Sequence, residues 1–150
     1  MAWKLKRFEE LSAEELYRIL KERVNVFVVE QNCPYPEIDD YDQGAFHLYK
    51  EVEGEVVAYS RILLPQTVYP EASIGRVIVN KKYRKEGLGR ELMERAMDFL
   101  RNDLKEETVK LQAQEYVKDF YGSFGFKPVS EVYLEDGIPH IDMVYKRKNN

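Results

Sequence analysis

The sequence predicts a mixed α/β fold in which helices cover a sheet, and three observations carry that prediction. An apolar run ends at Asn80 and is followed by a basic loop with two glycines and by a helical segment that reaches about Arg101. A capping box opens an amphipathic helix near the start of the chain. Two turn signals separate pairs of strand-like segments elsewhere. The chain has 150 residues, 44% hydrophobic and 33% charged, which is typical of one globular domain covering residues 1–150.

The first part of the chain reads as strand, helix, loop and hairpin. Residues 2–8 alternate weakly, and Ser12 with Glu15 forms the capping box of the next helix. That helix carries one apolar face, with Arg23 inside the stripe formed by Leu16, Ile19, Leu20, Val24, Phe27 and Val28. Residues 32–44 lack periodicity and contain two prolines, which predicts a loop. Residues 46–52 and 55–64 are expected to be strands joined at Glu53 and Gly54.

The second part continues the alternation of strands and helices. Residues 65–70 form a connector, 72–80 the central apolar strand, and Gly87 to about Arg101 a helix. Residues 108–114 form another strand, and 116–124 form a short helix that ends at Gly125. Residues 126–134 and 138–145 form a last hairpin around 135–137. The resulting order, β-α-β-β-β-α-β-α-β-β, predicts a mixed sheet.

Composition excludes several classes of protein and site. The net charge is −4 and the basic residues are scattered along the sequence, which argues against a nucleic-acid surface. No segment approaches the roughly 20 apolar residues of a membrane span, and the first ten residues lack the apolar stretch of a signal peptide. Cys33 is the one cysteine, so we expect a reducing cytoplasm and a buried side chain. Cys33, His47 and His140 are far apart in sequence, so no metal site is expected.

The loop after the central strand predicts an anion-binding site. A strand, a basic loop and a helix start in that order place free backbone N–H groups where an anion can dock. Gly87 and Gly89 carry no Cβ, so a ligand can approach the main chain, and Arg84 and Lys85 add positive charge. No Lys-Ser or Lys-Thr follows the glycines, which excludes a Walker loop. The third glycine of a dinucleotide-binding fingerprint is also missing.

Four segments together resemble one superfamily. The pattern Arg84-x-x-Gly87-x-Gly89 after an apolar strand resembles the acyl-CoA diphosphate loop of the GNAT superfamily of N-acetyltransferases. Residues 120–126, Phe-Tyr-Gly-Ser-Phe-Gly-Phe, match its Phe-Tyr-x-x-x-Gly-Phe signature, and residues 27–35 and 135–141 are similar to its ElaA-like branch. The resemblance implies a central, mostly antiparallel sheet flanked by helices, in which the parallel fourth and fifth strands splay apart.

The resemblance also implies an acetyl-CoA-dependent N-acetyltransferase that acts by direct attack in a ternary complex. It places the donor on the backbone of Val77, Ile78 and Val79, on the loop residues Arg84, Lys85, Gly87, Leu88, Gly89 and Arg90, and on Gln112 and Tyr121. A backbone N–H near Val77 or Ile78 would stabilise the oxyanion. Tyr121 would protonate the departing thiolate, because a phenol keeps its proton at neutral pH. The alternative is that Tyr121 is only a core aromatic side chain.

The sequence indicates the general base and the acceptor-binding residues less clearly than the donor site. Glu30 and His140 are candidate general bases, and deprotonation through water needs neither. Arg23 could pair with Glu30, seven residues later on a similar helix face, or have a buried structural or substrate-orienting role. Candidate substrate-binding residues are Arg23, Gln31, Arg76 and Gln114. Residues 30–42 hold five carboxylates and no Lys or Arg, so they form either a solvated loop or one that attracts a cationic amine.

Two alternative functions follow from the same residues. Arg23-x3-Phe27, Asp39, Asp42 and Arg61 resemble parts of acyl-homoserine-lactone synthases, which are longer proteins. A non-catalytic CoA-binding sensor is the second alternative. The acceptor, a small-molecule or peptide amine in the first interpretation, is not identified by the sequence, because one fold serves many functions. A homodimer is possible.

Overall fold

The computed structural model describes residues 3–148, and these residues form one eight-stranded sheet with three α-helices. The strands are β1 (Trp3–Arg7), β2 (Phe46–Val52), β3 (Glu55–Leu63), β4 (Ala72–Val79), β5 (Thr108–Gln114), β6 (Lys127–Pro128), β7 (Tyr133–Glu135) and β8 (Ile138–Lys146). The helices are α1 (Ala13–Val24), α2 (Leu88–Asp98) and α3 (Lys118–Gly122). The predicted first strand starts at Ala2, which lies outside the described residues.

The strand order is β1-β2-β3-β4-β5-β8-β6, and β7 also pairs with β8. Every neighbouring pair is antiparallel except β4 and β5, which are parallel. The predicted mixed, mostly antiparallel sheet is therefore confirmed.

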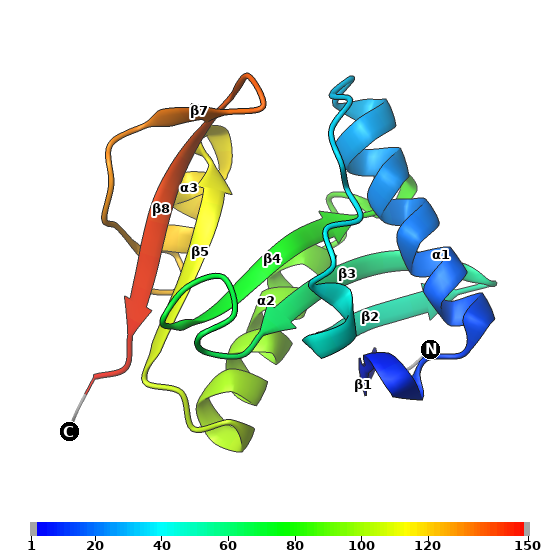
Figure 1. Cartoon of the computed structure of the whole chain (residues 1–150), viewed down its shortest axis with the longest axis horizontal. Coiled ribbons are helices and arrows are strands. Elements are labelled where there is room, and N and C mark those ends of the chain that lie inside the picture. The colour runs from blue at the N-terminus through cyan, green and yellow to red at the C-terminus, as the bar shows by residue number, and fades with distance from the viewer. Residues whose placement is uncertain (1–2, 149–150) are drawn as a thin grey trace.

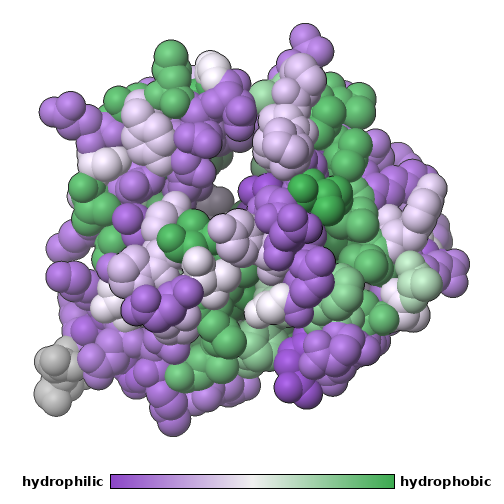
Figure 2. All heavy atoms as spheres, viewed as in Figure 1, coloured by the Kyte–Doolittle hydropathy of each residue, from purple (hydrophilic) through white to green (hydrophobic). Residues whose placement is uncertain are grey.

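The parallel strands β4 and β5 separate soon after they meet. They pair only at Ala72 with Val109 and at Ser73 with Lys110, whereas β5 pairs with β8 along its whole length. Figure 1 shows the two strands diverging, with β5, β7, β8 and α3 on one side and β1–β4 with α1 on the other. Figure 2 shows the surface hollowed between these two sides. The splayed strands expected from the sequence are present.

A β-bulge lies in β4 where the strands diverge. Arg61 pairs with Gly75 and Tyr59 with Ile78, so β4 carries one extra residue between these pairs. Arg76 lies in the bulge with φ 52°, a left-handed conformation that few non-glycine residues adopt. The bulge bends β4 away from β5 and changes the direction in which Val77 and Ile78 present their amides.

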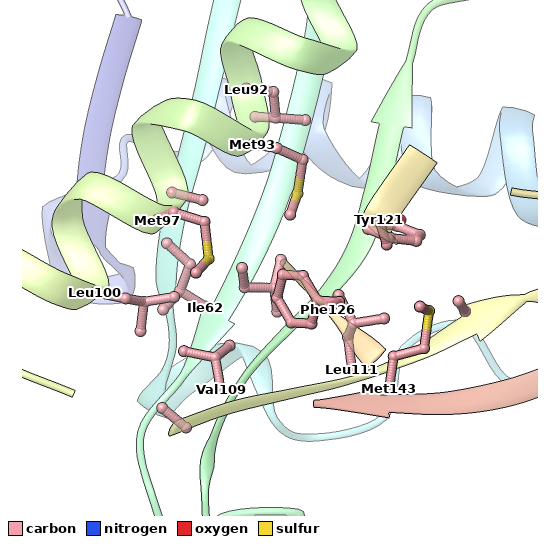
Figure 3. Close-up of a cluster of buried hydrophobic side chains, with 14 of the residues drawn as sticks. Ile62, Leu92, Met93, Met97, Leu100, Val109, Leu111, Tyr121, Phe126 and Met143 are labelled. Carbon is pink, nitrogen blue, oxygen red and sulfur yellow. The ribbon is translucent and has the colours of Figure 1, made fainter. Parts of the chain in front are cut away.

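Two apolar clusters cover the two faces of the sheet. The larger packs α2 onto the strands, and Figure 3 shows Met97 of this helix beside Ile62 and Met93 pointing toward Phe126. The smaller packs Ile19 of α1 and Val26 onto Tyr49, Tyr59 and Ile78. Alternate residues of β2 and β3 point to opposite faces, so both faces of these strands are buried.

The first helix starts, and two hairpins turn, at the residues that the sequence predicts. Ser12 Oγ accepts from Glu15 N at 3.0 Å, and Ser12 N donates to Glu15 Oε1 at 2.9 Å, which confirms the capping box. Glu53 and Gly54 have φ 49° and 78°, and Asp136 and Gly137 have φ 51° and 76°. Two consecutive positive φ values are typical of tight type I′ hairpin turns.

The largest differences from the predicted boundaries lie at two helix ends and in the last hairpin. Both long helices end in π-helical turns, Asn25–Glu30 after α1 and Phe99–Asp103 after α2. The predicted strand over 126–134 is wrong, because only 127–128 and 133–135 pair. Pro128 has no N–H to donate, and Ser130 Oγ takes the hydrogen bond of Asp142 N at 2.9 Å, so the ladder is interrupted there. None of the helices that the structure describes is long and apolar enough to cross a membrane.

Candidate active site

The glycine turn joins the end of β4 to the start of α2. Asn80 Oδ1 accepts from Lys82 N at 2.9 Å and opens a 3-10 turn, Lys81–Tyr83. The chain then reverses at Lys85 and Gly87, with φ 71° and 81°, before α2 begins at Leu88. Glu91 N donates to Gly87 O at 3.1 Å, so the N–H groups of the three preceding helix residues have no partner inside the helix. This geometry suits an anion.

Arg84 is held across the turn rather than pointing away from it. Its Nη1 and Nη2 donate to the Glu30 carboxylate at 2.7 and 3.0 Å, and its Nε donates to the Val79 carbonyl at 2.9 Å. The hydrogen bond from Arg84 lowers the pKa of Glu30, against the raising effect of burial. A carboxylate that ionises this readily is a weak base, which argues against Glu30 as the general base.

The start of α2 packs on α3. Phe120 Cζ would lie 3.6 Å from a Cβ at Gly89, and Val79 Cγ2 would lie 3.7 Å from it. The Arg90 guanidinium lies 4.7 Å from the centre of the Phe124 ring, and its Nη2 donates to Ser123 Oγ at 3.0 Å. The aromatic segment 120–126 thus packs against the start of α2 and supports the glycine turn. Lys85, in that turn, is exposed.

The main chain of β4 has an open edge beside this turn. Beyond Ser73, no strand that the structure describes pairs with β4 on the β5 side. Ile78 is buried against α1, while Val77 and Val79 are half-buried. The residues expected to bind the donor through their backbone therefore lie at the gap between the strands.

Tyr121 is buried in the core cluster at 9% exposure. Its ring lies 5.2 Å from that of Phe120 and 6.3 Å from that of Phe126, centre to centre, and Figure 3 shows it at the edge of the cluster. No hydrogen bond of its hydroxyl is found among residues 3–148. Burial, with a smaller contribution from Tyr116, raises the pKa of Tyr121, so the phenol stays protonated. Its core position is shown, and its role as an acid stays a prediction.

Two contacts bridge the gap between the two sides of the sheet. The side chains of Gln31 and Gln114 exchange hydrogen bonds of 3.4 and 3.2 Å. Cys33 is buried, as predicted, and its Sγ lies 3.6 Å from the Asp136 carbonyl oxygen. Gln31 ends the π-helical turn and Gln114 ends β5, so these predicted substrate residues meet at the mouth of the cleft.

His140 lies on the β8 face beside a polar cluster that sequence reasoning missed. Its Nδ1 lies 2.7 Å from the Ile138 carbonyl, and its ring stacks on Tyr133. Gln112 Nε2 donates to the Tyr133 hydroxyl at 2.8 Å, and that hydroxyl donates to the Asp142 carboxylate. Alternation along two paired strands, with Gln112 opposite Asp142, was the signal that could have identified this group.

The predicted Arg23–Glu30 pair is wrong. Arg23 is fully buried, and it donates through Nε to Glu37 at 2.6 Å and through Nη1 to Asp42 at 2.7 Å. The π-helical turn adds residues to each turn of the helix, so positions seven apart no longer stack. Arg23 therefore belongs to the interior and not to the acceptor mouth.

Three carboxylates of the acidic loop, Glu37, Asp39 and Asp42, pair with arginines, while Asp40 is exposed. Arg61 donates to Asp39 at 2.7 and 2.8 Å and to Asp42 at 3.0 Å. Arg76, at the bulge of β4, donates to Glu37 at 2.8 Å and to Asp39 at 3.1 Å. Three arginines from α1, β3 and β4 thus hold the loop against the sheet. Arg76, a predicted substrate residue, is committed to this network.

Comparisons with known proteins agree with this geometry. A family model described as an acetyltransferase (GNAT) domain matches residues 9–147. Protein ElaA from Escherichia coli (strain K12) is 44% identical over 143 residues, 94% of each chain. A crystal structure of Escherichia coli ElaA aligns with a TM-score of 0.91 and 42% identity, covering 97% of this chain and all of that one. An acyl-CoA N-acyltransferase from Pseudomonas aeruginosa aligns with a TM-score of 0.91 and 41% identity, covering 97% and 99%.

A more distant structure shows the fold alone. The CoA-dependent acyl-homoserine lactone synthase BjaI aligns with a TM-score of 0.78 at 18% identity, covering 96% of this chain and 82% of that one.

Proposed function

The chain belongs to the GNAT family of acetyltransferases, and we propose that it transfers the acetyl group of acetyl-CoA to the primary amine of a small molecule or peptide. The observation that carries this proposal is the unpaired edge of β4 leading directly into the glycine turn. An extended pantetheine arm can add to such an edge as a strand does, and a diphosphate can accept from the amides that open α2.

The residues present fit the donor. The Gly87 turn and the first amides of α2 are donors without partners inside the helix, and Arg84 and Lys85 supply positive charge beside them. A Cβ at Gly87 would meet nothing within 4 Å, so the approach to the backbone there is open, whereas Gly89 lets the start of α2 pack against Phe120. The three residues Val77, Ile78 and Val79 would hold the pantetheine amides, and Gln112 and Tyr121 would complete the donor site.

The transfer itself needs an oxyanion donor and an acid. The amide of Val77 or Ile78, beside the bulge at Arg76, would stabilise the developing oxyanion during direct attack by the amine. Tyr121 protonates the departing thiolate from its protonated, buried position. Because Glu30 is engaged by Arg84, His140 or water takes the proton of the amine. We further expect the enzyme to act in the cytoplasm, since its one cysteine is a free, buried thiol.

The proposal is tested by calorimetry with CoA and acetyl-CoA, followed by mass spectrometry of an amine panel incubated with acetyl-CoA. We expect heat of binding for both CoA and acetyl-CoA, and a mass increase of one acetyl group on an amine. Gly89→Leu should abolish donor binding, because its side chain would displace the start of α2 from Phe120 and disturb the turn. Gly44→Leu should not, because Gly44 has open space around it and lies outside the turn. Absence of binding overturns the proposal, and binding without any transfer favours a CoA sensor.

A lactone synthase is the less favoured alternative. The resemblance of this chain to such synthases rests on Arg23, Asp39, Asp42 and Arg61. Hydrogen bonds between these arginines and aspartates hold the acidic loop against the sheet. They explain how the loop is fixed without any role in substrate binding. An assay for lactone formation distinguishes the two activities.

A further inference from the structure

A second hollow lies at the opposite end of the sheet from the glycine turn. It has a volume of about 980 Å³ and is formed by the end of β8, the short β6 and the turn after α2. Five of its lining side chains are cationic, and we call it the basic groove after them: Arg101, Lys127, Lys146, Arg147 and Lys148. None of the lining residues that the structure describes is a carboxylate, although the chain as a whole carries a net charge of −4.

The charges of the basic groove are largely free. Arg101 lies 3.4 Å from Asp98, and the ion pairs within residues 3–148 include none of the other four cations. All four of those side chains are exposed. Arg147 reaches back with Nη1 to the Arg101 carbonyl at 3.3 Å, which fixes the two arginines beside each other. A cluster of like charges without counter-charges raises the local potential for an anionic partner.

The floor of the basic groove is apolar. Val144, Tyr145, Pro128 and Val129 line it, and Val129 is 57% exposed. The Arg101 guanidinium lies 5.9 Å from the centre of the Tyr145 ring. A hydrophobic floor with a charged rim is typical of a site that binds an apolar side chain among charged ones.

The groove is separate from the proposed transfer site. Lys146 pairs with Thr108 at the start of β5, whereas His140 pairs with Gln114 at its end. The seven residues of β5 between them span roughly 20 Å at about 3.3 Å per residue. A ligand in the basic groove therefore leaves the cleft between β4 and β5 open.

We propose that the basic groove docks an acidic peptide segment that carries an apolar side chain. The free cations select the acidic residues, and the floor of Tyr145 and Val129 accepts the apolar one. A small anion would leave the floor unused. Single-stranded nucleic acid binds through successive stacking platforms, and Tyr145 is the one aromatic residue among the described residues that line the groove. This docking does not depend on the acetyl-transfer proposal.

The test uses the full chain and a short fluorescein-labelled peptide of repeated Glu-Glu-Leu units, followed by fluorescence anisotropy. We expect saturable binding that weakens as salt is added. The double variant Lys127→Gln/Arg147→Gln should weaken it by about fivefold, the loss of two modest ion pairs. The matched control Lys21→Gln/Lys118→Gln removes the same charge from exposed positions outside the groove and should leave binding unchanged.

Two further probes separate the alternatives. A peptide of repeated Glu-Glu-Ser units has the same charge, and it should bind more weakly because the floor is then unused. Equal binding of both peptides, equal loss in the control variant, or tighter binding of a labelled single-stranded DNA of the same charge overturns the proposal. Absence of any peptide binding also overturns it.

Discussion

Arg84 holds the carboxylate of Glu30 with two parallel hydrogen bonds of 2.7 and 3.0 Å. The same guanidinium donates through Nε to the carbonyl of Val79, so it is fixed at the end of β4, beside the glycine turn. A planar guanidinium binds carboxylate and phosphate oxygens with the same fork geometry. Glu30 thus satisfies Arg84 in the way that a donor diphosphate would.

Removing the charge of Glu30 should tighten donor binding. In Glu30→Gln a neutral side-chain amide replaces the carboxylate that competes with the diphosphate for Arg84. The negative charge that would repel the diphosphate is lost as well. The pair is partly exposed, so we expect a gain of about 0.5 kcal/mol, or roughly twofold to threefold in the Kd for CoA by calorimetry. Glu14→Gln removes an equal charge from an exposed pair on α1 and should have no effect. Weaker binding in Glu30→Gln would show that Glu30 positions Arg84 for the donor instead.

Tyr121→Phe should lower turnover without weakening donor binding. Phenylalanine fits the same core position between Phe120 and Phe126, so the free energy of unfolding should change little. Loss of a positioned general acid typically costs about 10²-fold to 10⁴-fold in rate. Steady-state kinetics should show a fall in kcat with an unchanged Kd for CoA. An unchanged kcat would leave Tyr121 as a core aromatic alone.

The fold could be predicted from the sequence because its signals are local. The capping box at Ser12, the turns at Gly54 and Gly137 and the apolar run before Asn80 each act within a few residues. The interruption of the last hairpin was missed because it depends on Ser130 reaching Asp142, twelve residues away. The π-helical turn after α1 was missed because the apolar periodicity continues through it.

The residues of the site could likewise be predicted only where they are close together in the sequence. The glycine turn is a contiguous motif and was identified from the sequence. The hydrogen bonds between the three arginines and the acidic loop join residues that only the fold brings together. Arg61 and Asp42 are nineteen residues apart, and Arg76 and Glu37 thirty-nine. The acidic loop therefore looked solvated in sequence, although arginines distant in sequence pair with Glu37, Asp39 and Asp42 in the fold.

Truncating Arg23 should destabilise the fold strongly. Arg23→Met leaves Glu37 and Asp42 without the buried guanidinium that now pairs with both of them. Glu37 keeps Arg76 and Asp42 keeps Arg61, so we expect a loss of about 3 kcal/mol, the lower end of the cost of breaking a buried ion pair. Urea unfolding followed by circular dichroism should show this loss. Arg7→Met, which breaks an exposed pair with Glu9, should cost less than about 1 kcal/mol. Equal small losses in both variants would contradict the interior role of Arg23.

Stability should fall as the pH drops from about 4 toward 2, and Asp39 should contribute to that fall. Burial raises the pKa of Asp39, but the Arg61 guanidinium outweighs it and lowers the pKa from 3.8 to about 2. The unfolded chain therefore binds more protons in this window, and the stabilisation, about 2 kcal/mol for Asp39, is complete above pH 4 and is lost as the pH falls through 2. Unfolding free energies measured by urea titration at several pH values should show a shallower slope for Asp39→Asn than for the unmodified chain. Asp40→Asn, at an exposed neighbouring position, should keep the original slope. Parallel slopes for Asp39→Asn and the unmodified chain would show that the Asp39–Arg61 pair does not couple to folding.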